Sequence, residues 1–99
     1  MKYTITNTDG LSILALSGEI DLHYSPDLRK AILDIYKMDV SLEVDLSNVQ
    51  YLDSSGVACF VEAFQISKNK NLGFVMTNIS QPVMQVIKLA RLDSVFPIK

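Results

Sequence analysis

Strand-like and helix-like spacings of apolar residues alternate along this chain, and this alternation restricts the fold more than any other feature. Residues 3–6 and 11–17 read as strands on either side of Asp9–Gly10, a pair that suits a tight hairpin turn. Strand-like alternation returns at 40–46 and 72–77, and helical spacing appears at 25–37, 54–68 and 80–90. The predicted order of elements is β-β-α-β-α-β-α.

The strand predicted at 40–46 is apolar on one face and polar on the other. A strand covered by helices on both sides would be apolar throughout, so we expect an α/β fold with helices mainly on one face of a four-stranded mixed sheet. Helical crossovers make neighbouring strands parallel. The loops predicted at 18–25, 47–54 and 77–80 should then meet at one edge of the sheet, where sites form in such folds.

Local signals mark where the elements begin and end. Gly18 is expected to end the second strand. Ser25 and Ser80 each precede a proline by one or two residues, and serine with an early proline is typical of a helix start. Within the second helix, residues 57, 60, 61 and 64 have the spacing of a buried stripe.

Composition limits the classes of function. The 99 residues are 48% apolar and 20% charged, which predicts one globular domain over residues 1–99. The net charge is −2 and the nine basic residues are scattered, so a nucleic-acid partner is not expected. We also expect no membrane insertion, no bound cofactor and, because the first residues lead directly into a strand pattern, a cytoplasmic location.

The most informative segment is Asp53–Ser54–Ser55–Gly56, at a predicted strand-to-helix junction. Hydroxyls there lie close to the positive end of a helix dipole, so the helix should survive phosphorylation. The phosphate would then act by repelling a partner. Gly56 could leave room for the close approach of that partner. The same residue types also suit an ordinary helix cap, and both interpretations stay open at this stage.

Four residues are candidates for other chemistry. His23, the single histidine, could reach a serine, but the chain has no Gly-x-Ser-x-Gly elbow, so we expect a loop histidine and no enzyme. Cys59, the single cysteine, lies among apolar residues and is expected in the core, with no metal bound. Asp21 and Asp53 could pair around Mg²⁺, although carboxylates at such positions more often cap turns.

An apolar rim could surround this polar centre. Tyr24, Val49 and Tyr51 are predicted near the same edge, where exposed aromatic residues would suit a binding patch. Alternatively, Tyr51 and Leu52 tuck under the loop.

The segments Gly18–Glu19–Ile20–Asp21, Val44–Asp45–Leu46–Ser47, residues 51–56 and residues 90–96 together resemble the STAS domain of anti-sigma-factor antagonists. That family implies a non-enzymatic protein that binds an anti-sigma factor with serine kinase activity. The kinase would modify the second serine of the motif, Ser55, and a phosphoserine phosphatase would reverse the step. The positions expected to contact the partner are Asp21, His23, Tyr24, Asn48, Asp53, Ser54, Ser55 and Gly56.

STAS domains also serve as cytoplasmic subunits of bacterial ABC lipid transporters. A role beside a transporter ATPase subunit is therefore the alternative. The intact pair Ser54–Ser55 favours phosphorylation control.

Overall fold

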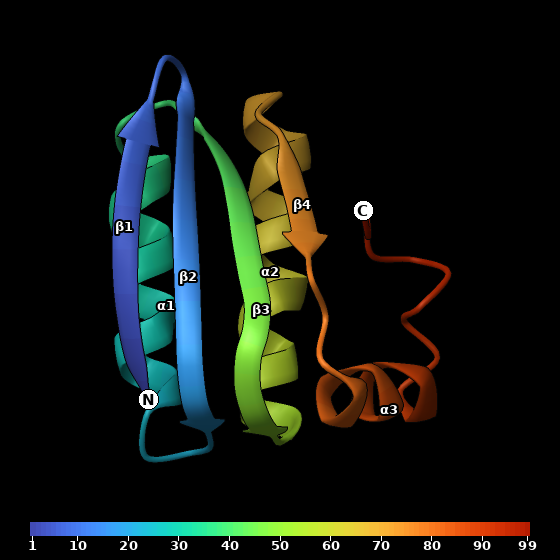
Figure 1. The fold of residues 1–99 in the computed structure, drawn as a ribbon. Helices are drawn as coiled ribbons and strands as arrows, with labels where there is room; N and C mark the ends of the chain where they lie inside the picture. The colour runs from blue at the N-terminus through green and yellow to red at the C-terminus, as the bar shows by residue number, and fades with distance from the viewer.

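A computed structural model describes all residues from 1 to 99 and shows one four-stranded sheet with three helices (Figure 1). The elements are β1 (Lys2–Thr8), β2 (Leu11–Ile20), α1 (Ser25–Tyr36), β3 (Ser41–Leu52), α2 (Ser54–Lys70), β4 (Phe74–Thr77) and α3 (Gln81–Leu89). The sheet order is β1-β2-β3-β4, with β1 antiparallel to β2 and the other neighbours parallel. The predicted order of elements and the mixed sheet are confirmed.

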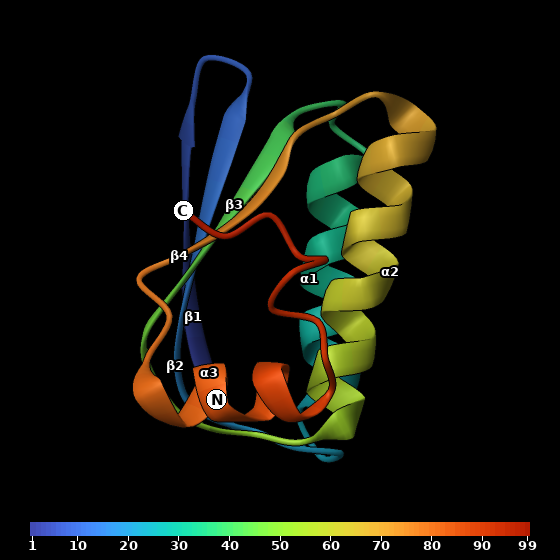
Figure 2. The same cartoon turned by 90° about the vertical axis from the view of Figure 1, so that its right-hand side faces the viewer.

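Helices α1 and α2 lie side by side on one face of the sheet, and the other face is left uncovered (Figure 2). Alternate residues of β2 and β3, such as Leu14 and Val44, point into this layer and meet Leu28, Ile32 and Phe60 of the helices; all five are buried. Burying a side chain of this size contributes roughly 1.5–3 kcal/mol, so this interface is the main source of stability. Helix α3 lies beside the carboxyl-terminal part of β3, beyond the end of β4 (Figure 1). No helix is long and apolar enough to cross a membrane.

Two predicted strand ends were wrong, because β2 accommodates a glycine without ending and β-bulges in β3 interrupt its alternation. Strand β2 continues through Gly18, which has a φ of +87°, as far as Ile20. Strand β3 continues to Leu52 instead of giving way to a loop at Ser47. The register between the two strands shifts near Ser17 and again at Gly18. Each bulge adds a residue and reverses which side chains face the core, so a strand there looks like a loop in sequence.

The two serines predicted at helix starts do not cap their helices. Ser25 is the buried first residue of α1, and its hydroxyl donates to the Leu22 carbonyl at 3.5 Å. The Ser80 hydroxyl donates to the Val49 carbonyl at 2.6 Å, so it fastens α3 to β3. Helix α2 runs two residues past the predicted end, to Lys70, because Asn71 adopts the left-handed conformation that stops it.

Candidate functional site

Asp53 organises the start of α2. Its Oδ1 atom accepts hydrogen bonds from the backbone N–H groups of Ser55 at 2.9 Å and Gly56 at 3.3 Å. The same oxygen accepts the Ser55 hydroxyl at 2.5 Å. These bonds, with the Ser55 hydroxyl contributing most, lower the pKa of Asp53. Ser55 therefore lies against a carboxylate that is ionised at neutral pH.

Asp21 closes the loop before α1 in the same way. Its Oδ1 atom accepts the backbone N–H groups of His23 at 3.0 Å and Tyr24 at 3.2 Å. The backbone N–H of Asp53 donates to the Ile20 carbonyl at 3.1 Å, which brings the two loops together. Both carboxylates thus serve as caps, and the structure gathers no group of three His, Cys, Asp or Glu side chains for a metal ion.

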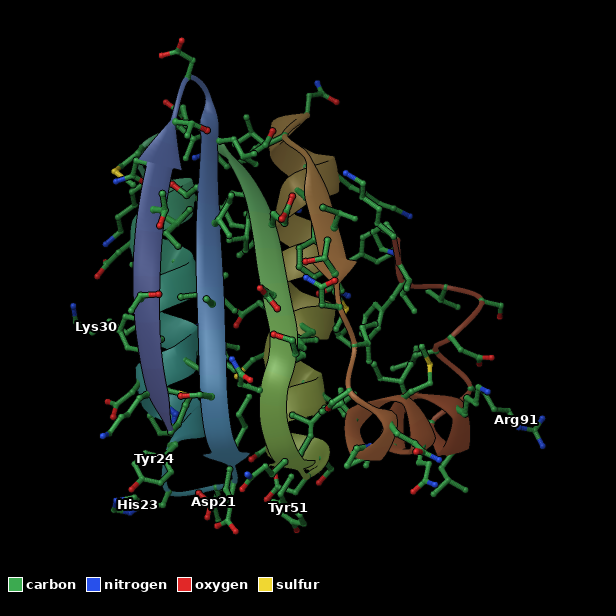
Figure 3. All side chains as sticks on the ribbon, viewed as in Figure 1. Asp21, His23, Tyr24, Lys30, Tyr51 and Arg91 are labelled. Carbon is green, nitrogen blue, oxygen red and sulfur yellow. The ribbon has the colours of Figure 1, made fainter.

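Ser55 is half-buried and its neighbour Ser54 is exposed. Around them, Leu22 is 75% exposed and Tyr51 is 49% exposed. Figure 3 shows Asp21, His23, Tyr24 and Tyr51 at the same end of the molecule. Leu22 was missed by sequence reasoning, although a leucine between two polar residues of a loop is a signal that could have found it. The result is a polar centre with two exposed apolar side chains beside it.

Three sequence expectations about this edge need correction. Val49 is 1% exposed and belongs to the core, so it is no part of an exposed patch. Gly56 is buried, and a Cβ there would lie 2.3 Å from Leu52 Cδ1 and 2.9 Å from Ile20 Cγ2. Its missing side chain makes room for the core instead of for a partner. The two alternatives for Tyr51 and Leu52 each hold for one residue: Tyr51 is exposed, as a binding patch requires, and Leu52 is buried under the loop.

Asn48 lies apart from the other candidate residues. It pairs with Ser17 in the sheet and lines a shallow hollow with Thr4 and Ala15 on the uncovered face. The bulge in β3 turns the Asn48 side chain to that face. The remaining candidates gather where β2 and β3 end.

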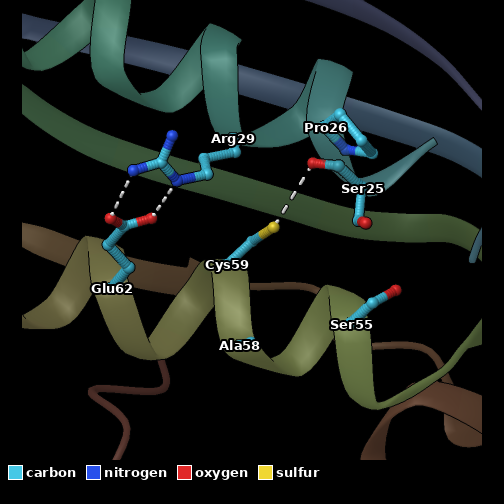
Figure 4. Close-up of a pocket in the computed structure, with 7 residues that line it drawn as sticks. All are labelled: Ser25, Pro26, Arg29, Ser55, Ala58, Cys59 and Glu62. Atoms are coloured by element: carbon cyan, nitrogen blue, oxygen red, sulfur yellow. Dashed lines mark hydrogen bonds and ion pairs between the residues drawn. The ribbon is translucent and has the colours of Figure 1, made fainter. Parts of the chain in front are cut away.

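A groove separates the N-terminal halves of α1 and α2 and opens beside Ser55 (Figure 4). Arg29 spans it, donating from Nε and Nη2 to the two Glu62 carboxylate oxygens at 2.7 and 3.0 Å. At its floor the Cys59 thiol donates to the Ser25 carbonyl at 3.4 Å, and burial raises the pKa of that thiol. The prediction that Cys59 is a core residue is confirmed. Arg29 was not anticipated, because its partner is 33 residues away in sequence.

Comparison with known proteins identifies the family. The family model described as the STAS domain matches residues 2–99. An anti-sigma-B factor antagonist of Listeria monocytogenes is 30% identical over 95 residues, which cover 94% of this chain and 82% of the relative.

Two solved structures share the fold. An anti-sigma factor antagonist from Mycobacterium paratuberculosis superposes with a TM-score of 0.85 at 28% identity, over 98% of this chain and 83% of that one. The Bacillus protein SpoIIAA in its phosphorylated form gives a TM-score of 0.77 at 19% identity, over 99% and 91% of the two chains. With its sheet, helix layer and edge loops in that arrangement, the chain belongs to the STAS domain family.

Proposed function

We propose that this chain is an anti-sigma-factor antagonist, a binding protein without catalytic activity that is switched off by phosphorylation of Ser55. The observation that carries the proposal is the Ser55 hydroxyl, half-buried at the edge of the sheet and hydrogen-bonded to Asp53. Relatives named as anti-sigma factor antagonists, and a phosphorylated SpoIIAA of the same fold, support it. The partner is an anti-sigma factor with serine kinase activity, working on cytoplasmic ATP, and a phosphatase restores the hydroxyl.

The local geometry supports modification without unfolding. Asp53 bonds the backbone N–H groups of Ser55 and Gly56 independently of the Ser55 hydroxyl. The cap of α2 is therefore retained when that hydroxyl is esterified. A phosphate adds a charge of about −1.5 to −2 beside the carboxylates of Asp21 and Asp53. The added charge changes the surface and leaves the core intact.

Leu22 and Tyr51 are the proposed apolar anchors for the partner, because exposed apolar and aromatic side chains carry much of the energy of protein interfaces. Asp21, His23, Tyr24, Asp53 and Ser54 are the proposed polar contacts around them. Asn48 and Gly56 are left out of this surface, since Asn48 lies on the uncovered face of the sheet and Gly56 is buried.

The test is a binding titration against the purified serine-kinase anti-sigma factor encoded in the same genome. We expect the unmodified chain to bind, and the chain carrying phosphoserine at position 55 to bind roughly 100-fold more weakly. That figure corresponds to a repulsion of about 3 kcal/mol across the interface. The comparison variant is Ser54→Ala, which removes one proposed polar contact without adding charge and should weaken binding far less than the phosphate does.

A second measurement identifies the acceptor. Incubation with the kinase and ATP should add one phosphate to the wild type and to Ser54→Ala, but none to Ser55→Ala, as read from intact mass. A phosphate found on a peptide without Ser55 would contradict the assignment. Equal affinity of the modified and unmodified chains would reject the switch. Specific binding to an ABC transporter ATPase subunit instead of the anti-sigma factor would replace this proposal with the transporter role.

A further inference from the structure

The groove beside Ser55 contains a single cationic side chain. The volume of the groove is about 350 Å³. The residues that line it are Ser25, Pro26, Arg29, Ser55, Ala58, Cys59 and Glu62. On α2, residues 55, 59 and 62 follow the i, i+4, i+7 spacing of one helix face, so Ser55 and Glu62 lie roughly 10 Å apart along the axis. A phosphate on Ser55 and the carboxylate of Glu62 would therefore share one groove.

Arg29 enters this groove between Ser55 and Glu62. Figure 4 shows its side chain leaving α1 at a level between Ser55 and Glu62 and turning toward Glu62. Long side chains on helices usually lean toward the helix N-terminus, which for α1 is the direction of Ser25 and Ser55. The Arg29 and Glu62 side chains are 56% and 36% exposed. An ion pair this exposed is weak and exchanges readily.

A phosphate cannot take the place of the Ser55 hydroxyl. That hydroxyl donates to Asp53 Oδ1 at 2.5 Å, and esterification removes the donor and brings a dianion against the carboxylate. The N–H groups of Ser55 and Gly56, which could otherwise hold an anion, already bond Asp53. The phosphoserine side chain must therefore rotate into another staggered conformation, away from Asp53. The neighbouring groove offers it a cation.

We propose that Arg29 leaves Glu62 when Ser55 is phosphorylated and becomes the intramolecular ligand of the phosphate. This inference rests on the proposed function, since it concerns the modified form of Ser55. In the transfer, Ser55 Oγ bonds to the γ-phosphorus of ATP, the bond from that phosphorus to ADP breaks, and the hydroxyl proton passes to the adjacent Asp53 carboxylate and on to solvent.

Charge and geometry favour the exchange. Phosphoserine carries about −1.5 to −2 charges and three acceptor oxygens, against a single charge on Glu62. The planar guanidinium can bind a phosphate through two parallel hydrogen bonds, as it now binds the carboxylate. The exchange holds the phosphate in the groove between α1 and α2 and leaves Glu62 without its partner. The anti-sigma factor would then meet the Glu62 carboxylate, no longer paired with Arg29, in the same groove as the modified serine.

The experiment uses the full chain with phosphoserine placed biosynthetically at position 55, and follows the second ionisation of the phosphate by ³¹P NMR. In the wild-type background we expect a pKa below about 6, the usual value for a phosphoserine. Arg29→Gln should raise the pKa by about half a unit or more, a threefold change in the ionisation constant. The nitrogen resonance of Arg29 Nε should move with the same titration.

The matched control is Lys30→Gln. Lys30 is the next residue on α1, carries the same charge and pairs with Asp34 outside the groove, with Nζ–Oδ2 at 2.9 Å. The Lys30→Gln substitution should leave the phosphate pKa unchanged. The other titratable side chains at this end of the molecule, Asp21, His23, Asp53 and Glu62, are the same in both variants. Equal shifts in the two variants, or none in either, would overturn the inference.

Glu62→Gln supplies a double-mutant cycle. It should lower the phosphate pKa more when Arg29 is present than in the Arg29→Gln background, because it frees the arginine as well as removing a charge. An equal effect in both backgrounds would show that Arg29 does not bind the phosphate. No kinase is needed to prepare these proteins, so a failure here leaves the binding switch standing. A failure of any kinase to modify Ser55 would instead end the proposed function.

Discussion

The two ends of the α1–α2 layer are fastened in different ways. At the end where the helices finish, here called the closed end (Tyr36, Asp39, Ser41, Lys70 and Gly73), side-chain bonds join separate elements. The Tyr36 hydroxyl donates to the Gly73 carbonyl at 3.1 Å, and Lys70 Nζ donates to the Tyr36 carbonyl at 2.6 Å. Lys70 also pairs with Asp39 at 2.8 Å.

At the opposite end, here called the rim (residues 21–24 and 51–55), the side-chain bonds are local. Asp21 bonds residues two and three positions ahead, and so does Asp53. Leu22 and Tyr51 stay exposed beside them. The comparison teaches that the closed end holds the fold together, whereas the rim is capped internally and its surface is free to be modified or bound without unfolding.

The largest expected effect comes from adding a methyl group at each end. Gly56→Ala places a Cβ 2.3 Å from Leu52 Cδ1, so the core beneath the rim must shift. We expect a loss of about 1–3 kcal/mol in the free energy of unfolding, reduced by the better helix propensity of alanine. Gly73→Ala at the closed end meets Ser41 Oγ at 3.0 Å and should cost less. Urea unfolding measures both, and a larger loss for Gly73→Ala would reverse the comparison.

Alkaline pH should weaken the closed end through Tyr36. Burial raises the pKa of Tyr36, so the unfolded chain loses that proton first. The free energy of unfolding should then fall as pH rises above about 10, by up to ~1.4 kcal/mol per pH unit from this group. The raised pKa of Cys59 also lowers the free energy of unfolding as pH rises, and it does so in every variant.

Tyr36→Phe removes the tyrosine contribution and should flatten the alkaline slope, at a cost of about 0.5–1.5 kcal/mol at neutral pH for the lost hydrogen bond to Gly73. Tyr51→Phe, at the exposed rim, is the control and should retain the wild-type slope. The check is the slope of the free energy of unfolding against pH from pH 9 to 11. Equal slopes for wild type and Tyr36→Phe would show that the buried Tyr36 phenol does not control the stability of the closed end.

Removing the rim cap should have a smaller effect. Asp53→Ala takes away the acceptor of two backbone N–H groups and should cost about 1 kcal/mol, while Asp53→Asn should retain most of that stability. The pKa of Asp53 is lowered in the fold, so its contribution is present above the unfolded value near 4 and is lost as pH falls through the folded value. Thermal unfolding between pH 2 and 7 checks this, and an unchanged acid limb in Asp53→Ala would count against it.

The smallest effect is expected for Arg29 in the unmodified protein. Arg29→Gln removes an exposed ion pair and should leave the melting temperature unchanged within error. Lys70→Gln at the closed end should lower it measurably, because Lys70 also donates to the Tyr36 carbonyl. A clear destabilisation by Arg29→Gln would mean that the Arg29–Glu62 ion pair in the groove stabilises the fold of the unmodified protein.

The sequence by itself determined the order of elements, the mixed sheet and the single helix-covered face. Those features follow from hydrophobic periods that can be read locally in each element, as in the alternation of Leu42, Val44 and Leu46. It also marked Asp53–Ser54–Ser55–Gly56 as the start of a helix, because capping depends on residues two or three positions apart.

Only the tertiary structure decided what surrounds that serine. The bulges that carry β3 on to Leu52 turn Asn48 to the uncovered face and bury Val49, and they leave no periodic signal. The filling of the space beside Gly56 by Leu52 and Ile20, and the bond from Arg29 to Glu62, join residues from different elements. Local spacing predicts which backbone will form, but contacts between distant segments exist only once the helices have packed on the sheet.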